Sequence, residues 1–436
     1  MDLKSSADER TRVSDWIEYR HHPLAVSAML LILAVLVGLT AFRTYRNYST
    51  PSVEFSWVNR GYSDFHNGTY FPTKAFVDGK SPYSPDVANE YGMARATPSY
   101  SPVVFLIHVP FALLPLQVSR VLFFGFNLVL IAGLAFCGLK MSMQRFRWFD
   151  FLAFTNLLLL SRPGHITIFT GYFTAEIVVG CILALHFSKT RPAISGLGLV
   201  LASIKPNFVI PLMLLMAFRK DFRAILFGIV FCAVAAGIGL GWLGYHNGMS
   251  QVIADVRGGQ ESLHVDPSEM PVNTWTRVDL LGMYAKVVDW VPRDGVYLGC
   301  MFVLVTLVGV GMNRIVAIES NQGATGPSAL IVVLTVLLSI YHHSYDCLLL
   351  AVPAIGLIFF GPTTLKEIPP RIRLVLAFLI AVPAVNYLST KMVLEFLAFE
   401  PLGVTWQAIT MINGVCLFFA LGILLVASAR KLDVGK

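Results

Sequence analysis

The run Pro23–Phe42, PLAVSAMLLILAVLVGLTAF, decides the class of fold because it contains no charged side chain. Its length matches the roughly 20 residues that a helix needs to cross a bilayer. Similar apolar runs recur along the chain: 56% of its 436 residues are hydrophobic and only 14% are charged, whereas soluble domains have about 25% charged residues. The sequence therefore predicts an all-α, polytopic helical membrane protein and not a soluble enzyme on an anchor.

Basic residues set the predicted orientation. The segment 1–22 contains Arg10, Arg12 and Arg20, which places the start of the first span in the cytoplasm. No small-residue cleavage site follows this span, so we expect it to be retained. The net charge of +7 is explained by such clusters and does not require a nucleic acid partner. All six cysteines lie in or beside apolar runs, without a C-x-x-C pair, and are interpreted as small buried hydrophobes.

The first extracytoplasmic loop is predicted over 43–118. It contains a short apolar run, 102–116, interrupted by Pro110 and Pro115. If that run crossed the membrane, the basic cluster at 140–147 would lie outside, against the positive-inside rule. We therefore expect 102–116 to be re-entrant or interfacial, and the segment 119–139 to cross.

The remaining chain is predicted to complete one transmembrane domain, 23–436, with about twelve spans, extracytoplasmic loop helices, a second long extracytoplasmic loop at 245–296, and both termini inside. The later spans are predicted at 149–161, 172–188, 192–204, 206–218, 224–244, 297–313, 327–341, 346–361, 373–389 and 405–427. Several are shorter than a bilayer requires, which is tolerable where they line a protein-enclosed or wet cavity.

In this topology, the polar segments that interrupt the apolar runs lie at the extracytoplasmic ends of the spans. They are Asp64, Arg162–His165, Lys205–Asn207, His342–Asp346 and the loop 245–296, which includes Arg277 and Asp279. Ionisable groups at membrane depth are expensive and by default indicate function. The sequence therefore predicts an active site at the extracytoplasmic face.

The motifs that the sequence lacks limit the reactions that this face could catalyse. The sequence has no P-loop, no nucleophile elbow and no zinc-spaced Cys/His set, and we predict neither a metal nor a cofactor. Because ATP and nucleotide sugars are not supplied outside the cell, an activated donor has to arrive in the membrane, as a lipid-linked phosphosugar does. Its use requires a carboxylate base, for which Asp64 is the candidate, and groups that hold the leaving phosphate. The candidates for the second role are Lys205, His342, His343, His165 and Arg162.

These features resemble the polyprenyl-phosphate-dependent mannosyltransferases of glycosyltransferase family 87, which have the GT-C fold. The resemblance covers about residues 20–360 in short motifs. The motifs are the Asp64 loop followed by FVDGKSPYSP, the turn Tyr100-Ser101-Pro102 leading into FLIHVPFALLP, the turn Gly164–His165 or less closely Gly171–Tyr172, the break Lys205-Pro206-Asn207, and the cluster His342–Asp346.

The resemblance implies inverting transfer of a hexose, mannose in these relatives, from a polyprenyl-phosphate donor to a lipid or glycan acceptor. It implies that Asp64 is the general base in an extracytoplasmic site of a multi-pass protein of the plasma or cytoplasmic membrane. The partners are then the lipid-linked sugar, the acceptor and membrane lipids. The glutamine usual in the family's Gly-Gln turn is replaced by His165. Arg162 and His165 also fit ordinary residues at a helix end.

Simpler interpretations stay open for the other candidates. Asp64 fits a helix cap or a solvated loop carboxylate, and Lys205 fits a side chain that snorkels to the interface. On a helix, His342 and His343 would point about 100° apart, so at most one would face a cavity. Asp346 fits a cap of the following helix.

A transporter or flippase of a lipid-linked or amphipathic solute is the alternative function. Such proteins often show two similar halves with matched broken helices. The two long outer loops of this sequence do not resemble each other, and no such repeat is evident. The enzyme is therefore the favoured hypothesis.

Overall fold

The computed structural model describes residues 22–49, 62–91, 93, 100–142, 146–265, 270–290, 294–318, 323–358 and 369–434. Apart from His22, the predicted cytoplasmic segment 1–22 lies outside these ranges, as do residues 50–61 of the first predicted loop.

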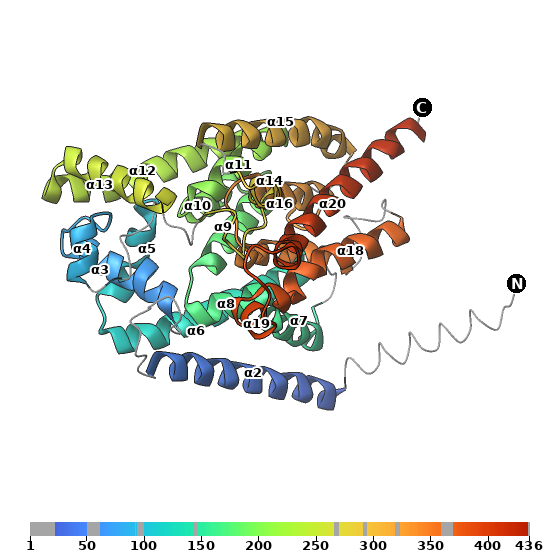
Figure 1. Ribbon diagram of the computed structural model, residues 1–436. Helices are drawn as coiled ribbons and strands as arrows, with labels where there is room; N and C mark the ends of the chain where they lie inside the picture. Colours follow the sequence, from blue (N-terminus) through green and yellow to red (C-terminus); the bar gives the residue numbers. More distant parts are fainter. Residues whose placement is uncertain are drawn as a thin grey trace, which may run out of the picture.

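The described residues form an all-helical protein (Figure 1). The order is α2 (Pro23–Ser49), π-helix η2 (Phe65–Tyr70), α3 (Phe71–Val77), α4 (Pro85–Glu90), α5 (Val103–Ala112), α6 (Leu116–Ser142), α7 (Trp148–Leu160), α8 (Arg162–Thr170), α9 (Thr174–Phe187), α10 (Pro192–Ala202), α11 (Pro206–Phe218) and α12 (Phe222–Asn247). There follow α13 (Met249–Val265), α14 (Leu280–Val288), α15 (Asp294–Ile318), α16 (Pro327–Ser339), 3₁₀-helix η3 (Ser344–Leu350), α17 (Ala351–Ile358), α18 (Pro370–Val385), η4 (Tyr387–Ser389), α19 (Lys391–Phe396) and α20 (Val404–Val434).

Helices α9 and α16 form the centre of the molecule, because nearly every residue of both is buried. Helix α9 packs closely on α10. A Cβ added at Gly180 would lie 2.6 Å from the Gly198 carbonyl oxygen, and one at Gly198 would lie 2.5 Å from the Gly180 carbonyl oxygen. Both distances are shorter than any real Cβ contact, so glycine at these two positions lets the helix backbones touch.

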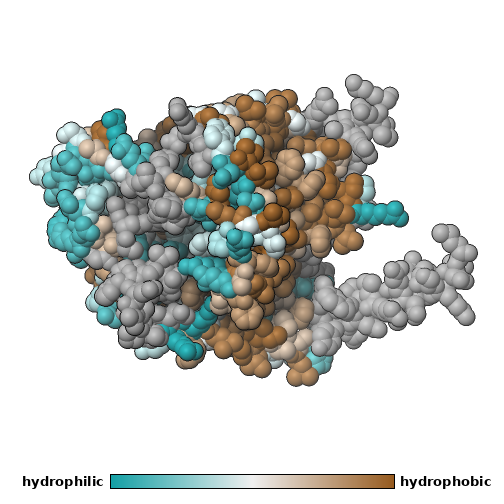
Figure 2. All heavy atoms as spheres, in the orientation of Figure 1, coloured by the Kyte–Doolittle hydropathy of each residue, from teal (hydrophilic) through white to brown (hydrophobic). Residues whose placement is uncertain are grey.

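The outer helices form an apolar surface suited to a bilayer. Among the described residues, α2, α6, α12, α15, α18 with η4, and α20 are the six helices long and apolar enough to cross a membrane. Hydrophobic residues form a broad band on the face shown in Figure 2, and hydrophilic residues gather at the end that holds α3, α4 and α13. The chain is therefore a membrane protein. Helix length supports six of the approximately twelve predicted crossings.

The remaining predicted spans correspond to shorter apolar helices. These are α7, α9, α10, α11, α16 and the pair η3 and α17. Helix α2 begins and α20 ends on the same side of the molecule in Figure 1, which agrees with an even number of crossings. A short helix held inside the protein does not need to match the bilayer thickness by itself.

The boundaries of the first predicted loop need correction. Helix α2 continues to Ser49, beyond the predicted end at Phe42. The apolar run 102–116 divides into the 10-residue helix α5 and the first residue of α6, with Pro115 in the turn between them. Because α5 is too short to cross a bilayer and packs against α3 and α12, it joins the loop helices to the transmembrane part.

The second long loop is also largely helical. Helix α12 extends to Asn247, α13 folds back against it, and α14 packs on α20. Between α13 and α14 the chain forms an isolated antiparallel bridge, Arg277 with His343. This bridge connects the second loop to the late polar cluster that the sequence singled out.

Candidate active site

Asp64 lies at the start of a strained, partly buried segment. Tyr62, two residues earlier, has φ of +67°, and its N–H donates to the Phe169 carbonyl over 2.9 Å. A bulky residue adopts this left-handed conformation only when its surroundings hold it there. Asp64 then precedes the π-helix η2 and is half-buried. π-Helical turns are rare and frequently mark functional sites.

Gly171 fixes this segment against the turn between α8 and α9. Its φ is +69°, and an added Cβ would lie only 2.7 Å from the Phe65 Cβ. Both the conformation and the space therefore require glycine. As a result Tyr172, the next residue, is placed close to the segment that carries Asp64.

Lys205 does not snorkel to the interface. It caps α11 in an extended conformation, and Pro206 begins the helix. The residue is only 6% exposed, and its Nζ lies 3.6 Å from the Asp346 Oδ1 and 4.4 Å from the centre of the Tyr172 ring. The ammonium is thus held inside the protein by one carboxylate and by aromatic faces.

Asp346 organises the opposite side of this ion pair. Its Oδ2 accepts the His343 backbone N–H over 3.0 Å, so Asp346 closes a capping box from the third position of η3, and His343 is the N-cap residue. The same oxygen lies 3.1 Å from the His342 Nδ1. A fully buried carboxylate is stable only with such compensation. One residue therefore both caps η3 and holds the positions of Lys205 and His342.

The helical geometry assumed for His342 and His343 is wrong. The two residues lie before η3, and His343 is extended with φ −101° and ψ 163°. Successive side chains of an extended chain point to opposite faces. His342 packs edge-on against Phe208, at 4.4 Å between ring centres, while His343 stacks on Tyr345 and its Nδ1 lies 2.6 Å from the Thr276 Oγ1. The two imidazoles therefore lie on different sides of this segment, one beside Phe208 and the other beside Tyr345.

The second long loop supports these histidines. The Val278 N–H donates to the His342 carbonyl over 2.9 Å, and the Ser344 N–H donates to the Thr276 carbonyl over 2.7 Å. Beside them, Arg277 makes two hydrogen bonds of 2.8 Å to Asp279. Burial would raise the pKa of Asp279, but Arg277 outweighs it and holds that pKa below the usual range. Arg277 is thus already paired and braces the loop.

Two tyrosines, Tyr172 and Tyr345, contact the Lys205 ammonium, and a third, Tyr100, contacts Tyr172; the sequence analysis assigned none of them to the site. The hydroxyls of Tyr100 and Tyr172 lie 2.6 Å apart, and the rings of Tyr172 and Tyr345 lie 5.1 Å apart. The segment that carries Asp64 borders these rings: a Cβ added at Gly68 of η2 would lie 3.9 Å from the Tyr100 Cε2. The polar cluster, as we define it, comprises Tyr100, Tyr172, Lys205, His342, His343, Tyr345 and Asp346, with Asp64 at its edge.

A signal for two of these tyrosines was present in the sequence. Tyr100 opens the turn before α5, and Tyr172 belongs to Gly171–Tyr172, the less favoured match to the family's Gly-Gln turn. The structure places this second match within the polar cluster. Gly164 lies instead in the first turn of α8, where an added Cβ would be 2.0 Å from the Leu158 carbonyl oxygen. The geometry therefore favours Gly171–Tyr172 as the counterpart of the functional turn.

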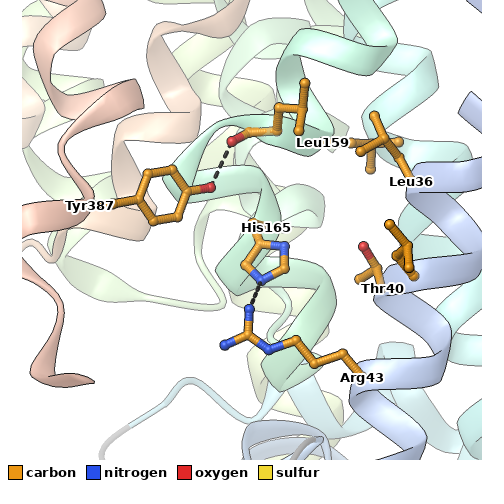
Figure 3. Close-up of a pocket in the computed structure, with 8 residues that line it drawn as sticks. Leu36, Thr40, Arg43, Leu159, His165 and Tyr387 are labelled. Atoms are coloured by element: carbon orange, nitrogen blue, oxygen red, sulfur yellow. Dashed lines mark hydrogen bonds between the residues drawn. The ribbon is translucent and has the colours of Figure 1, made fainter. Parts of the chain in front are cut away.

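Arg162 and His165 do not join the polar cluster. The fully buried Arg162 guanidinium donates to the Asn386 carbonyl over 3.1 Å, to the Ser389 carbonyl over 2.8 Å, and to the Ser389 hydroxyl. It therefore ties α8 to the end of α18. His165 turns toward α2, where its Nε2 lies 3.1 Å from an Arg43 nitrogen (Figure 3).

The polar cluster brings together a buried cation, carboxylates and aromatic hydroxyls. The half-buried Asp64 belongs to a segment that borders the rings of Tyr100 and Phe173, and the buried Lys205 ammonium lies on the rings of Tyr172 and Tyr345. In the part of the chain that the structure describes, no three His, Cys, Asp or Glu side chains group as metal ligands would. The arrangement fits proton removal at one end and charge stabilisation at the other.

Comparison with known families gives one match. The profile described as Glycosyltransferase family 87 matches residues 99–340, which is more than half of the chain. This range includes Tyr100, Tyr172 and Lys205 of the polar cluster. Asp64 lies before it, and His342, His343, Tyr345 and Asp346 lie after it. No curated protein matches the sequence. No solved structure matches it either.

Proposed function

The chain belongs to glycosyltransferase family 87, and we propose that it transfers a hexose, mannose, from a polyprenyl-phosphate donor to a lipid or glycan acceptor. The proposed reaction takes place at the extracytoplasmic face and inverts the anomeric centre. The observation that carries this proposal is the buried Lys205–Asp346 pair on the rings of Tyr172 and Tyr345, beside the segment that carries Asp64. These groups come from distant parts of the sequence and are joined by the fold.

In the proposed mechanism, Asp64 acts as the general base. Its carboxylate accepts the proton of the acceptor hydroxyl while the hydroxyl oxygen forms a bond to the anomeric carbon. The bond between that carbon and the phosphate oxygen breaks on the opposite face, and its electron pair stays with the polyprenyl phosphate. A positioned general base typically accelerates such a step by about 10²–10⁴-fold.

Lys205 supplies the charge stabilisation in this mechanism. The leaving phosphate gains negative charge as the bond breaks, and a fixed ammonium in a dry site stabilises that charge more than in the ground state. Asp346 and the rings of Tyr172 and Tyr345 keep the ammonium in place beforehand. The tyrosine faces are also suited to stack on a sugar.

The test is a transfer assay with purified protein in nanodiscs. Wild type and Asp64→Asn receive radiolabelled polyprenyl-phosphate mannose and a membrane lipid extract, and labelled lipid product is measured. We expect product from wild type and a rate lower by about 10²–10⁴-fold from Asp64→Asn. Asp86→Asn, the same change at an exposed carboxylate of α4, is the matched control and should remain active. Equal rates for wild type and Asp64→Asn would remove Asp64 from the mechanism. A glucose donor preferred over mannose would correct the sugar.

A further inference from the structure

A buried pair of ionisable side chains, His108 and Glu176, lies beside the polar cluster and has no part in the mechanism above. His108 belongs to α5, and Glu176 to the first turn of α9. The residues are 0% and 3% exposed, and the His108 Nε2 lies 3.0 Å from the Glu176 Oε1. Because burying ionisable groups costs free energy, such a pair is a candidate functional feature.

The hydrogen-bond partners fix the number of protons on this pair. The His108 Nδ1 lies 2.7 Å from the Val104 carbonyl oxygen, which can only accept, so Nδ1 carries a hydrogen. The contact between Nε2 and the Glu176 Oε1 then needs one further proton, because two lone pairs would repel each other. With that proton on either atom the pair has no net charge. His108 and Glu176 are therefore joined by one shared proton.

The surroundings leave each member dependent on the other. The His108 ring lies among the rings of Phe111, Phe123 and Phe173, at 6.1, 5.6 and 6.2 Å between centres. The Glu176 Oε2 is buried and accepts no hydrogen bond from the residues that the structure describes. The shared proton is thus what compensates the Glu176 carboxyl for its loss of water.

On the α9 side, the pair leads to the aromatic wall under Lys205. Glu176 lies one helical turn after Tyr172, whose ring centre is 4.4 Å from the Lys205 Nζ. Phe173 stacks on Tyr172, at 4.4 Å between ring centres, and contacts the His108 ring on its other side. The position of Tyr172 is therefore coupled to the position of His108 through Phe173.

On the α5 side, the pair leads to the same ammonium. Tyr100 and Ser101 precede α5, and the Tyr100 hydroxyl lies 2.6 Å from the Tyr172 hydroxyl. The Ser101 N–H donates over 3.1 Å to the carbonyl of Ile204, the residue before Lys205. Helix α5 packs mainly against α3, α12, η2 and α6, so its link to α9 depends on individual side chains. The His108–Glu176 pair supplies such a link and closes a ring of contacts around Lys205.

We propose that His108 and Glu176 are positioning residues for the transfer reaction. By joining α5 to α9, they hold the Tyr100–Tyr172 contact and thereby the place of the Lys205 ammonium at the leaving phosphate. This role rests on the proposed function, in which Lys205 stabilises that phosphate. Neither residue contacts the substrate in this account. A side chain at 176 that gives one N–H to the His108 Nε2 should therefore serve as well as glutamate.

The kinetic test compares three variants in the nanodisc transfer assay. Glu176→Leu keeps the volume but removes the shared proton, and kcat should fall about tenfold or more while the KM for the lipid extract stays unchanged. Glu176→Gln donates its amide N–H to the His108 Nε2 and should stay within about twofold of the wild-type kcat. Ser195→Ala is the matched control. It removes a buried hydrogen bond of 2.6 Å to the Ala184 carbonyl, at the other end of α9, and should keep the wild-type kcat.

The link itself is tested without activity, by hydrogen exchange of the segment 100–107. Glu176→Leu should lose protection in this segment, which contains the Ser101 N–H, whereas Glu176→Gln and Ser195→Ala should keep it. Unchanged protection in Glu176→Leu would overturn the link.

The positioning role fails on any of three kinetic results. These are a wild-type kcat in Glu176→Leu, a Glu176→Gln variant as slow as Glu176→Leu, and an equal loss in Ser195→Ala. If wild type transfers no sugar, the proposed function fails and the positioning role with it, while the exchange measurement still decides the link between α5 and α9.

Discussion

The polar cluster and the first turn of α8 make an instructive comparison. The sequence analysis proposed cations from both regions for the donor phosphate, namely Lys205, His342 and His343 in the first and Arg162 and His165 in the second. In the structure the first three lie together around Asp346. Arg162 is engaged with backbone carbonyls near Ser389, and His165 turns to α2. A buried cation thus indicates a functional site only where it lies among other polar side chains, as Lys205 does. It does not where backbone carbonyls take up its donors, as they do for Arg162.

The largest difference between the regions is expected for Lys205→Met. Without the ammonium, the leaving phosphate loses its charge stabilisation, and the transfer rate should fall by about 10²-fold or more. Because the change leaves the buried Asp346 without its cation and could destabilise the fold, the rate is measured only on protein that elutes as a folded monodisperse species. Lys205→Arg, which keeps the charge, should recover part of the activity. A wild-type rate in Lys205→Met would contradict the assignment.

Arg162→Met should act on stability instead. It leaves the carbonyls of Asn386 and Ser389 without their donor, and each lost bond to a charged group costs about 1.5–3 kcal/mol. The thermal unfolding midpoint should fall clearly, while the transfer rate per folded molecule stays within about threefold of wild type. A loss of rate in folded protein as large as that of Lys205→Met would place Arg162 in the reaction centre.

The two glycine turns offer the next contrast. In Gly171→Ala the new Cβ meets the Phe65 Cβ, which displaces the Asp64 segment, and we expect about a tenfold loss of transfer, near 1.4 kcal/mol in the barrier. In Gly164→Ala the Cβ meets the Leu158 carbonyl oxygen, and stability should fall with the rate per folded molecule retained. Kinetics and thermal unfolding of both variants decide which turn serves the active site.

The smallest effect is expected for Thr276, a residue of the second long loop that contacts His343 of the polar cluster. Thr276→Val keeps the shape of the side chain but removes the hydroxyl that contacts the His343 Nδ1. A neutral hydrogen bond is worth about 1 kcal/mol, so the transfer rate should fall roughly fivefold. Thr274→Val is the control, because its hydroxyl donates to the Met270 carbonyl in the same loop. Equal rates for the two variants would show that His343 needs no positioning.

Much of the fold was predictable from hydrophobicity, and the site only in part. The uncharged apolar runs predicted the positions of the helices from residue 119 onward. They did so because burial in the protein and contact with the bilayer both favour apolar side chains. Lys205, Asp64 and His342–Asp346 stood out since charge is costly among such runs. The fates of Arg162 and His165 depend on residues far away, at Ser389 and Arg43, which no local pattern reveals.

The extended backbone at His343 could not be predicted for a related reason. It depends on the bridge to Arg277, a contact between segments distant in sequence. The tyrosines around Lys205 were overlooked because aromatic residues are common at membrane interfaces and carry no charge. Their place in the cluster follows only from the fold, which puts Tyr172 and Tyr345 on one ammonium and Tyr100 against Tyr172.

The central claim is that Asp64 and the Lys205–Asp346 pair serve a single transition state. The most direct measurement is a double-mutant cycle of single-turnover transfer with wild type, Asp64→Asn, Lys205→Met and the double variant. Residues that act as a unit are grossly non-additive. We therefore predict a double variant about as slow as the slower single variant. A double variant whose loss equals the product of the two single losses would show that the residues act independently, and would contradict a shared reaction centre.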